Sequence, residues 1–282
     1  MREKLILIRG GGDLATGVAH RLYQAGFRLL ITEQEQPTVI RRSVAFANAV
    51  YEGTMKVEGV TAAHIKQVEE AEICWKQKQI PVVVGDAAVL CRHLKVNALV
   101  DATLSKRNTG IRRNLAPIVI GIGPGFEAGV DVDAVVESQR GHLLGRVIYE
   151  GKAQPNTGIP GIIAGVGRER LIQSPAAGVF KAEAAIGDVV KAGQRVASVD
   201  KKPVTASIDG LLRGLLADGL TVTEGFKIGD VDPRIQPEFC RLISDKARAI
   251  GGGVLEAILH LHWKEKSFNG CPPGPADIIS IH

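Results

Sequence analysis

The chain has 282 residues, of which 45% are hydrophobic and 4% aromatic, so its length suits about two domains with aliphatic cores. Its net charge of +5 permits an anionic ligand, but no basic run is interleaved with aromatic residues, so we expect no nucleic-acid partner. No apolar segment approaches the roughly 18 residues of a membrane-spanning helix, and the first apolar run does not have the pattern of a signal peptide, so we expect a cytoplasmic protein with no membrane partner.

The amino-terminal part follows the order strand, glycine turn, helix, strand and acid. Residues 5–8 form a continuous apolar run, typical of a parallel strand that is buried on both faces. Gly10, Gly12 and Ala15 follow with the spacing G-x-G-x-x-[GA]. A segment with helical apolar spacing, a second apolar run and then Glu33 complete the pattern, which is that of a dinucleotide-binding unit.

Each part of this unit has a physical role in binding. Glycine allows main-chain N–H groups to approach a pyrophosphate, and the amino end of the helix adds a partial positive charge. Glu33 can accept hydrogen bonds from ribose hydroxyls, and its charge repels a 2′-phosphate. The predicted binding residues here are Gly10, Gly11, Gly12, Asp13, Leu14, Ala15 and Glu33. The alternative is that the glycines only make a close turn and that Glu33 caps the next segment.

Helical and strand patterns then alternate. The sequence predicts helices over residues 37–50, 61–78 and 86–93, and strands over residues 80–84, 98–101 and 118–120. Such alternation predicts a parallel sheet with helices on both faces, and ligands on such sheets lie beyond the carboxyl ends of the strands.

Several arginines follow predicted strand ends. Arg107 belongs to a basic loop with Lys106, Arg112 and Arg113, and Arg41 closely follows Glu33. Arginine suits bidentate contact with phosphate or carboxylate, so Arg41 and Arg107 are added to the predicted site. The alternatives are a solvated loop for Arg107 and a helical surface for Arg41.

Residues 174–228 contain one pattern twice, 32 residues apart, which indicates two copies of one supersecondary unit. A glycine-rich passage over residues 155–167 marks a domain boundary near residue 170. The repeat resembles the biotinyl/lipoyl barrel, in which a lysine between two methionines carries the cofactor. Lys201 and Lys202 stand at the corresponding hairpin without either methionine, so no covalent biotin or lipoate is expected.

The fold class predicted from these features is α/β, with three parts. They are a Rossmann-like parallel-sheet domain over residues 1–170, a small all-β biotinyl/lipoyl-like barrel over residues 171–235, and a C-terminal helix and tail over residues 236–282 that pack on the core. Residues 243–263 are predicted to be helical at their C-terminal end. Gly251–Gly253, just before that helix, either cradle an anion at its amino end or permit close packing.

No catalytic set emerges from the sequence, so the catalytic residues stay unassigned. His142 is the best single candidate for an acid or base, and a hydrogen-bonded structural histidine is the alternative. The spacing of histidines and cysteines predicts no metal site. The cysteines lie far apart without a C-x-x-C motif, as expected of reduced and inert thiols: Cys74, Cys91, Cys240 and Cys271.

Distinctive motifs run through nearly the whole chain. They are GGGDLATG at residues 10–17, EQEQP at 33–37, IRR at 40–42, GPGF at 123–126, RGH at 140–142 and DKARAIGGG at 245–253. Together they resemble the YqeB-like accessory family of selenium-dependent molybdenum hydroxylases.

The resemblance implies a factor that matures a molybdenum hydroxylase of the xanthine-dehydrogenase type, with the apo-enzyme subunit as partner and a possible homo-oligomer. The expected cofactor is NAD(P) or a molybdopterin-type nucleotide. Two alternatives stay open: an NAD-dependent oxidoreductase of a small substrate, and a non-catalytic interaction protein with a vestigial Rossmann crevice.

Overall fold

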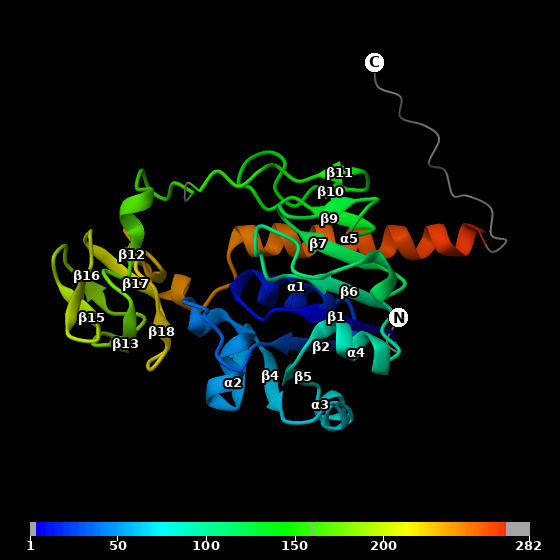
Figure 1. Cartoon of the computed structure of the whole chain (residues 1–282), viewed down its shortest axis with the longest axis horizontal. Coiled ribbons are helices and arrows are strands. Elements are labelled where there is room, and N and C mark those ends of the chain that lie inside the picture. The colour runs from blue at the N-terminus through cyan, green and yellow to red at the C-terminus, as the bar shows by residue number, and fades with distance from the viewer. Residues whose placement is uncertain (1–3, 159–160, 269–282) are drawn as a thin grey trace, which may run out of the picture.

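A computed structural model describes residues 4–158 and 161–268, with side chains described up to residue 263. Its centre is a nine-stranded sheet in the order β10-β9-β7-β6-β1-β2-β5-β4-β3 (Figure 1). Neighbouring pairs from β9 to β4 are parallel, and β10 and β3 add an antiparallel strand at each edge. The strands are β1 (Leu5–Arg9), β2 (Arg28–Glu33), β3 (Thr54–Val57), β4 (Val60–Ile65), β5 (Ile80–Val84), β6 (Ala98–Asp101), β7 (Val119–Ile122), β9 (Ala134–Val136) and β10 (Val147–Ile148).

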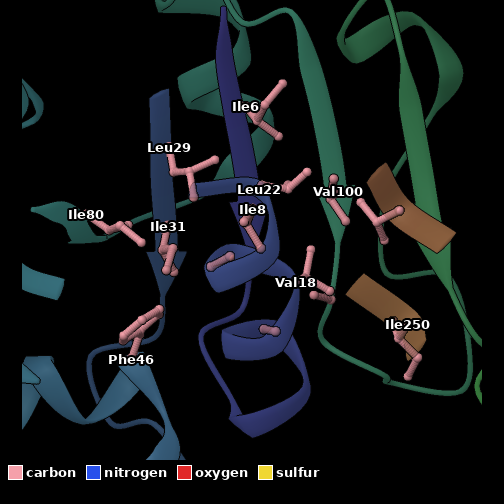
Figure 2. Packing of buried hydrophobic residues seen from close by; sticks show 14 of the residues in the cluster. Ile6, Ile8, Val18, Leu22, Leu29, Ile31, Phe46, Ile80, Val100 and Ile250 are labelled. Atoms are coloured by element: carbon pink, nitrogen blue, oxygen red, sulfur yellow. The ribbon is translucent and has the colours of Figure 1, made fainter. Parts of the chain in front are cut away.

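Side chains of the sheet point alternately to its two faces, and a different set of helices covers each face. Ile6 and Ile8 lie in one apolar cluster, and Leu5 and Leu7 lie in the other. This alternation follows from the two-residue period of a strand. The first cluster is completed by α1 (Asp13–Gln24), α2 (Ala49–Glu52) and α5 (Asp245–Phe268), and the second by α3 (Ala71–Lys76) and α4 (Ala87–His93). Figure 2 shows the first cluster, with strand side chains facing Val18 and Leu22 of α1.

Helices α1 and α5 pack closely because glycines face each other across their contact. A Cβ at Gly17 would lie 2.6 Å from the Cβ of Ala247, and one at Gly251 would lie 2.8 Å from the carbonyl oxygen of Gly17. A Cβ at Gly253 would meet the carbonyl oxygen of Gly145. Close packing is therefore the alternative that holds for Gly251–Gly253. The anion cradle is wrong because these residues lie inside α5 and not at its amino end.

We expect Gly251→Ala to lower the free energy of unfolding by about 1–2 kcal/mol, because overpacking against α1 outweighs the gain in helix propensity. Gly252→Ala is the matched control, since a Cβ there would meet nothing within 4 Å on the same helix. That control should stabilise the chain by up to about 1 kcal/mol. Urea unfolding measures both, and equal effects of the two changes would contradict the packing argument.

Residues 171–232 form what we call the two-sheet unit, at one end of the molecule (Figure 1). Its sheets have the orders β12-β19-β17-β14 and β16-β15-β13-β18. The strands are β12 (Leu171–Gln173), β13 (Gly178–Ala182), β14 (Val189–Val190), β15 (Arg195–Val199), β16 (Lys202–Thr205), β17 (Gly210–Leu215), β18 (Thr221–Val222) and β19 (Lys227–Asp232). The sequence repeat is confirmed, since β13, β14 and β15 recur as β17, β18 and β19. The copies interlock, because β14 pairs with β17 of the second copy and β18 pairs with β13 of the first.

The predicted fold class, a parallel sheet followed by a separate all-β barrel, is wrong. The central sheet is mixed, because β3 and β10 are antiparallel to their neighbours. The two-sheet unit is not separate either, since Ile40 packs against its apolar core and accepts a hydrogen bond from the N–H of Leu215, 2.8 Å. Arg42 donates from Nε to the carbonyl of Leu215, 2.9 Å. The fold is α/β, with a large mixed sheet and a C-terminal helix.

The predicted strands over residues 80–84, 98–101 and 118–120 and the helices over 86–93 and 243–263 are confirmed in outline. The predicted helix over residues 61–78 is wrong at its start, which belongs to β4, because residues 62–65 pair with β5. Within residues 141–149, β10 is the strand that forms. The remaining short elements are η1 (Arg42–Val44), η2 (Phe46–Asn48), η3 (Val68–Glu70), η4 (Arg113–Leu115), η5 (Arg168–Arg170), η6 (Pro237–Cys240), β8 (Glu127–Ala128) and β11 (Gly151–Lys152).

The predicted helix over residues 37–50 is replaced by η1, η2 and the start of α2. Tertiary contacts hold this segment in its irregular path. The N–H of Phe46 donates to Oγ1 of Thr16, 2.8 Å, and Ser43 donates from Oγ to the carbonyl of Cys240, 2.6 Å. No helix among the described residues has the length and apolar character needed to cross a bilayer.

Candidate nucleotide-binding cleft

The turn between β1 and α1 exposes main chain at its last glycine. Gly10 has a positive φ of +90°, which glycine adopts without strain, and its N–H donates to the carbonyl of Thr32, 2.8 Å. The N–H of Gly11 donates to Oε2 of Glu33, 2.7 Å. Gly12 is the N-cap of α1 and no side chain caps that helix, while a Cβ at Gly12 would meet nothing within 4 Å. The amino end of α1 is therefore open to a ligand.

A cleft of about 430 Å³, which we call the glycine cleft, opens at this turn. Of the predicted site residues, it is lined by Gly10, Gly12, Asp13, Leu14, Ala15 and Glu33. It lies between the carboxyl ends of β1 and β6, where the strand order reverses. Ligands of open α/β sheets bind at such a reversal. The volume is within the usual range for small-molecule sites.

Glu33 is turned toward the glycine turn. Its Oε2 accepts from Gly11 and its Oε1 accepts from the N–H of Gln34, 2.8 Å. These two bonds fix the carboxylate, and each oxygen keeps a lone pair for a further donor such as a ribose hydroxyl. Glu33 can therefore accept these two main-chain hydrogen bonds and bind a ligand at the same time.

Three predicted site residues lie outside the wall of the cleft. Gly11 packs behind it, where a Cβ would lie 2.8 Å from the nitrogen of Ala47. Arg41 is buried and donates from Nη1 to Oδ2 of Asp13, 3.0 Å, so it reaches the cleft only through that carboxylate. Arg107 is exposed, as the solvated-loop alternative has it, and its main chain packs against Gly125.

The sequence patterns did not indicate two residues that close the cleft from the two-sheet unit. Phe226 and Lys227 line it opposite the glycine turn. Lys227 reaches solvent, yet the surrounding protein desolvates its ammonium and lowers its pKa, an effect that the charges of Asp230 and Asp13 oppose. Lys227 lines the same cleft as the amino end of α1, and its ammonium form suits a bound phosphate. Nothing in the sequence signals this role, because both residues lie within the repeat.

The titratable side chains that line the cleft are Asp13, Glu33 and Lys227. Among the described residues that line it there is no histidine and no cysteine. His142 is exposed on the loop before β10, away from this cleft. Among the described residues, no group of three or more histidine, cysteine, aspartate or glutamate side chains is placed to hold a metal ion. Cys271 lies outside the described residues.

Burial keeps the described thiols in their neutral form. Cys74 and Cys240 are buried, and desolvation raises the pKa of both. It also raises the pKa of Cys91 to about 11. Thiolates are the reactive form of cysteine, so these side chains are poor nucleophiles at neutral pH.

Comparisons with known proteins were made for sequence and for structure. No family model matches the chain. The aspartoacylase family protein of Mesorhizobium loti is 11% identical with a TM-score of 0.25, covering 81% of this chain and 84% of that one. The product-bound ectoine utilization protein EutE (DoeB) of Ruegeria pomeroyi is 12% identical with a TM-score of 0.24, covering 81% and 84%. At these TM-scores neither structure defines the fold or the activity of this chain.

The sequence similarity is much stronger. The chain is 51% identical over 259 residues to the uncharacterized protein YqeB of Escherichia coli (strain K12), a match that covers 92% of this chain. It spans about half the length of that relative, 48%. This similarity supports a YqeB-like family for the chain, as its sequence motifs indicated.

Proposed function

We propose that the chain binds a dinucleotide or a molybdopterin-type nucleotide in the glycine cleft and acts as an accessory factor in the maturation of a selenium-dependent molybdenum hydroxylase. The observation that carries the binding part is the open, uncapped amino end of α1 beside Gly12, faced by Lys227 and flanked by Glu33. The maturation part rests on the resemblance of the sequence motifs to the accessory family, while the similarity to the uncharacterized protein YqeB supports the coarser, YqeB-like assignment.

The residues of the cleft fit the polar part of such a nucleotide. Main-chain N–H groups at the start of α1 and the ammonium of Lys227 suit a phosphate, and the fixed carboxylate of Glu33 suits ribose hydroxyls. A pterin nucleotide would carry the metal-binding chemistry itself, so the protein would need to hold and orient it. Lining residues without histidine or cysteine agree with such a role.

The test is to identify small molecules released by denaturing freshly purified protein. Mass spectrometry should detect a pterin nucleotide or an adenine dinucleotide in amounts close to the protein. Calorimetry with NAD⁺ then measures binding at the emptied cleft. Recovery of neither class, together with no heat on adding NAD⁺, would contradict the binding proposal.

A separate experiment addresses maturation. Cells that lack the protein should contain the molybdenum hydroxylase as an inactive polypeptide with a substoichiometric molybdenum content. Fully loaded hydroxylase in such cells would contradict the maturation role. A change in reduced-nicotinamide absorbance with a small substrate would instead favour an NAD-dependent oxidoreductase.

A further inference from the structure

A second cavity of about 500 Å³ lies between the two-sheet unit and the start of α5. We call it the arginine pocket, because Arg41, Arg140, Arg213 and Arg234 line it. The orange start of α5 lies beside the yellow strands of the two-sheet unit in Figure 1. The ion pair between Arg41 and Asp13 separates this pocket from the glycine cleft, since Arg41 lines one and Asp13 lines the other.

The four guanidinium groups are held in place by acids and carbonyls. Arg41 donates from Nη2 to the carbonyl of Phe239, 2.9 Å, in addition to its pair with Asp13. Both Nη atoms of Arg140 donate hydrogen bonds to the carboxylate of Asp245, 2.7 and 3.0 Å. A ligand therefore meets cations whose side chains are already ordered, which lowers the entropy cost of binding.

Asp232 pairs with the other two arginines of the pocket, Arg213 and Arg234. It accepts from Nη1 of Arg213, 3.1 Å, and from Nε and Nη2 of Arg234, 2.8 and 2.6 Å. Burial opposes its ionisation, but hydrogen bonds from Arg234 and the charges of Arg213 and Arg234 prevail and lower the pKa of Asp232 to about 2. The carboxylate therefore stays ionised and keeps both guanidinium groups at the pocket.

The wall of the pocket is rich in guanidinium groups, although each of the four arginines also pairs with an acid. Among the described residues that line it, Asp245 is the acid that faces four arginines. The hydrogen bonds to Asp245 raise the pKa of Arg140, and the nearby charge of Arg234 opposes that effect, so the two cations repel each other. An anion bound between them would relieve that repulsion.

The rest of the wall is apolar. Phe239, Leu242 and Ile162 line the pocket, and Ile162 is 71% exposed. The guanidinium of Arg234 lies over the ring of Phe239, 4.4 Å from its centre. The charged part of the wall is therefore in contact with its apolar part at this point. A volume of about 500 Å³ also far exceeds what a simple oxyanion fills.

We infer that the arginine pocket binds the phosphate group of a phosphorylated organic molecule, whose apolar part lies against Ile162, Phe239 and Leu242. Arginine is suited to phosphate because its planar fork donates two parallel hydrogen bonds. This site is separate from the glycine cleft and does not depend on the function proposed for that cleft.

Calorimetric titration of the full chain at low salt tests the inference with two probes, inorganic phosphate and phenyl phosphate. Both should bind saturably at the arginine pocket, and phenyl phosphate should bind more tightly because its ring adds apolar contact. Arg140→Gln should weaken phenyl phosphate about tenfold, the effect of losing one charge-assisted hydrogen bond. Arg195→Gln is the matched control, since it also removes one exposed arginine that pairs with one acid, Glu183, outside the pocket.

Further variants separate this pocket from the glycine cleft. Arg234→Gln should weaken phenyl phosphate like Arg140→Gln, and thermal unfolding checks that both variants are folded. Gly12→Asp, which places a negative charge in the glycine cleft, should leave phenyl phosphate binding unchanged. The inference is overturned if neither probe binds, if Arg195→Gln weakens binding as much as Arg140→Gln, or if Gly12→Asp alone removes it.

Discussion

Gly12→Asp is expected to weaken binding of NAD⁺, used as a probe for the glycine cleft, by about 100-fold. Gly12 has φ −62° and ψ 178°, an extended N-cap conformation that aspartate also adopts, and a Cβ there would meet nothing within 4 Å. The new carboxylate would accept the N–H groups of the first helical turn and repel a phosphate. Titration calorimetry gives the change in Kd, and thermal unfolding should show an equally or more stable fold.

Gly12→Asn is the control for charge, because asparagine has nearly the same size and also caps helices. It should lose clearly less affinity for NAD⁺ than Gly12→Asp. Equal losses in the two variants would assign the effect to shape and not to charge. Unchanged binding in Gly12→Asp would mean that the ligand does not use the amino end of α1.

Asp230→Ala is expected to lower the free energy of unfolding by about 3–5 kcal/mol, the usual cost of breaking a buried ion pair. Asp230 accepts from Nη1 of Arg170, 2.9 Å, and the side chains of the pair are only 3% and 6% exposed. It also lies 3.2 Å from Nε of Arg213. Removing the carboxylate leaves Arg170 buried with the carbonyl of Gly161, 3.3 Å away, as its remaining described partner. Guanidinium unfolding measures the loss.

Asp209→Ala is the matched control in the same unit. Asp209 pairs with Lys191 at 2.9 Å, but these side chains are 57% and 76% exposed. Water replaces such a pair at little cost, so the midpoint of unfolding should hardly move. A similar midpoint for both variants would show that burial does not set the strength of the Asp230 pair.

The two cavities lie on either side of one ion pair. Asp13 lines the glycine cleft at the start of α1, and Arg41 lines the arginine pocket. The side chain of Arg41 is 6% exposed and that of Asp13 is 29% exposed, so the contact is partly screened by solvent. Ligands in the two cavities would therefore act on opposite ends of the same contact.

Patterns of neighbouring residues in the sequence were enough to predict much of the central sheet. The apolar run at residues 5–8, the glycines after it and Glu33 at the end of the next strand predict β1, the turn, α1 and β2 as found. The repeat likewise predicts strands that recur at equal spacing in the two-sheet unit. These features follow from turn chemistry and from apolar periodicity, which act over a few residues.

Where the prediction failed, distant contacts replaced local preference. Residues 37–50 have the pattern of a helix, yet Arg41 and Arg42 bond to the carbonyls of Phe239 and Leu215, far along the chain. The separate barrel is wrong for the same reason, since Ile40 adds to the core of the two-sheet unit. The sequence around these residues contains no pattern that predicts either contact.

The sequence alone therefore determined the order of strand, glycine turn, helix and strand at the start of the chain and the repeated strands, because each is encoded by neighbouring residues. The tertiary structure decided that Lys227 closes the glycine cleft and that four arginines from distant segments line one pocket. It also excluded Arg107 from the cleft. Such placements depend on which residues, distant in the sequence, the fold brings together, and the weak preferences of single segments do not specify that.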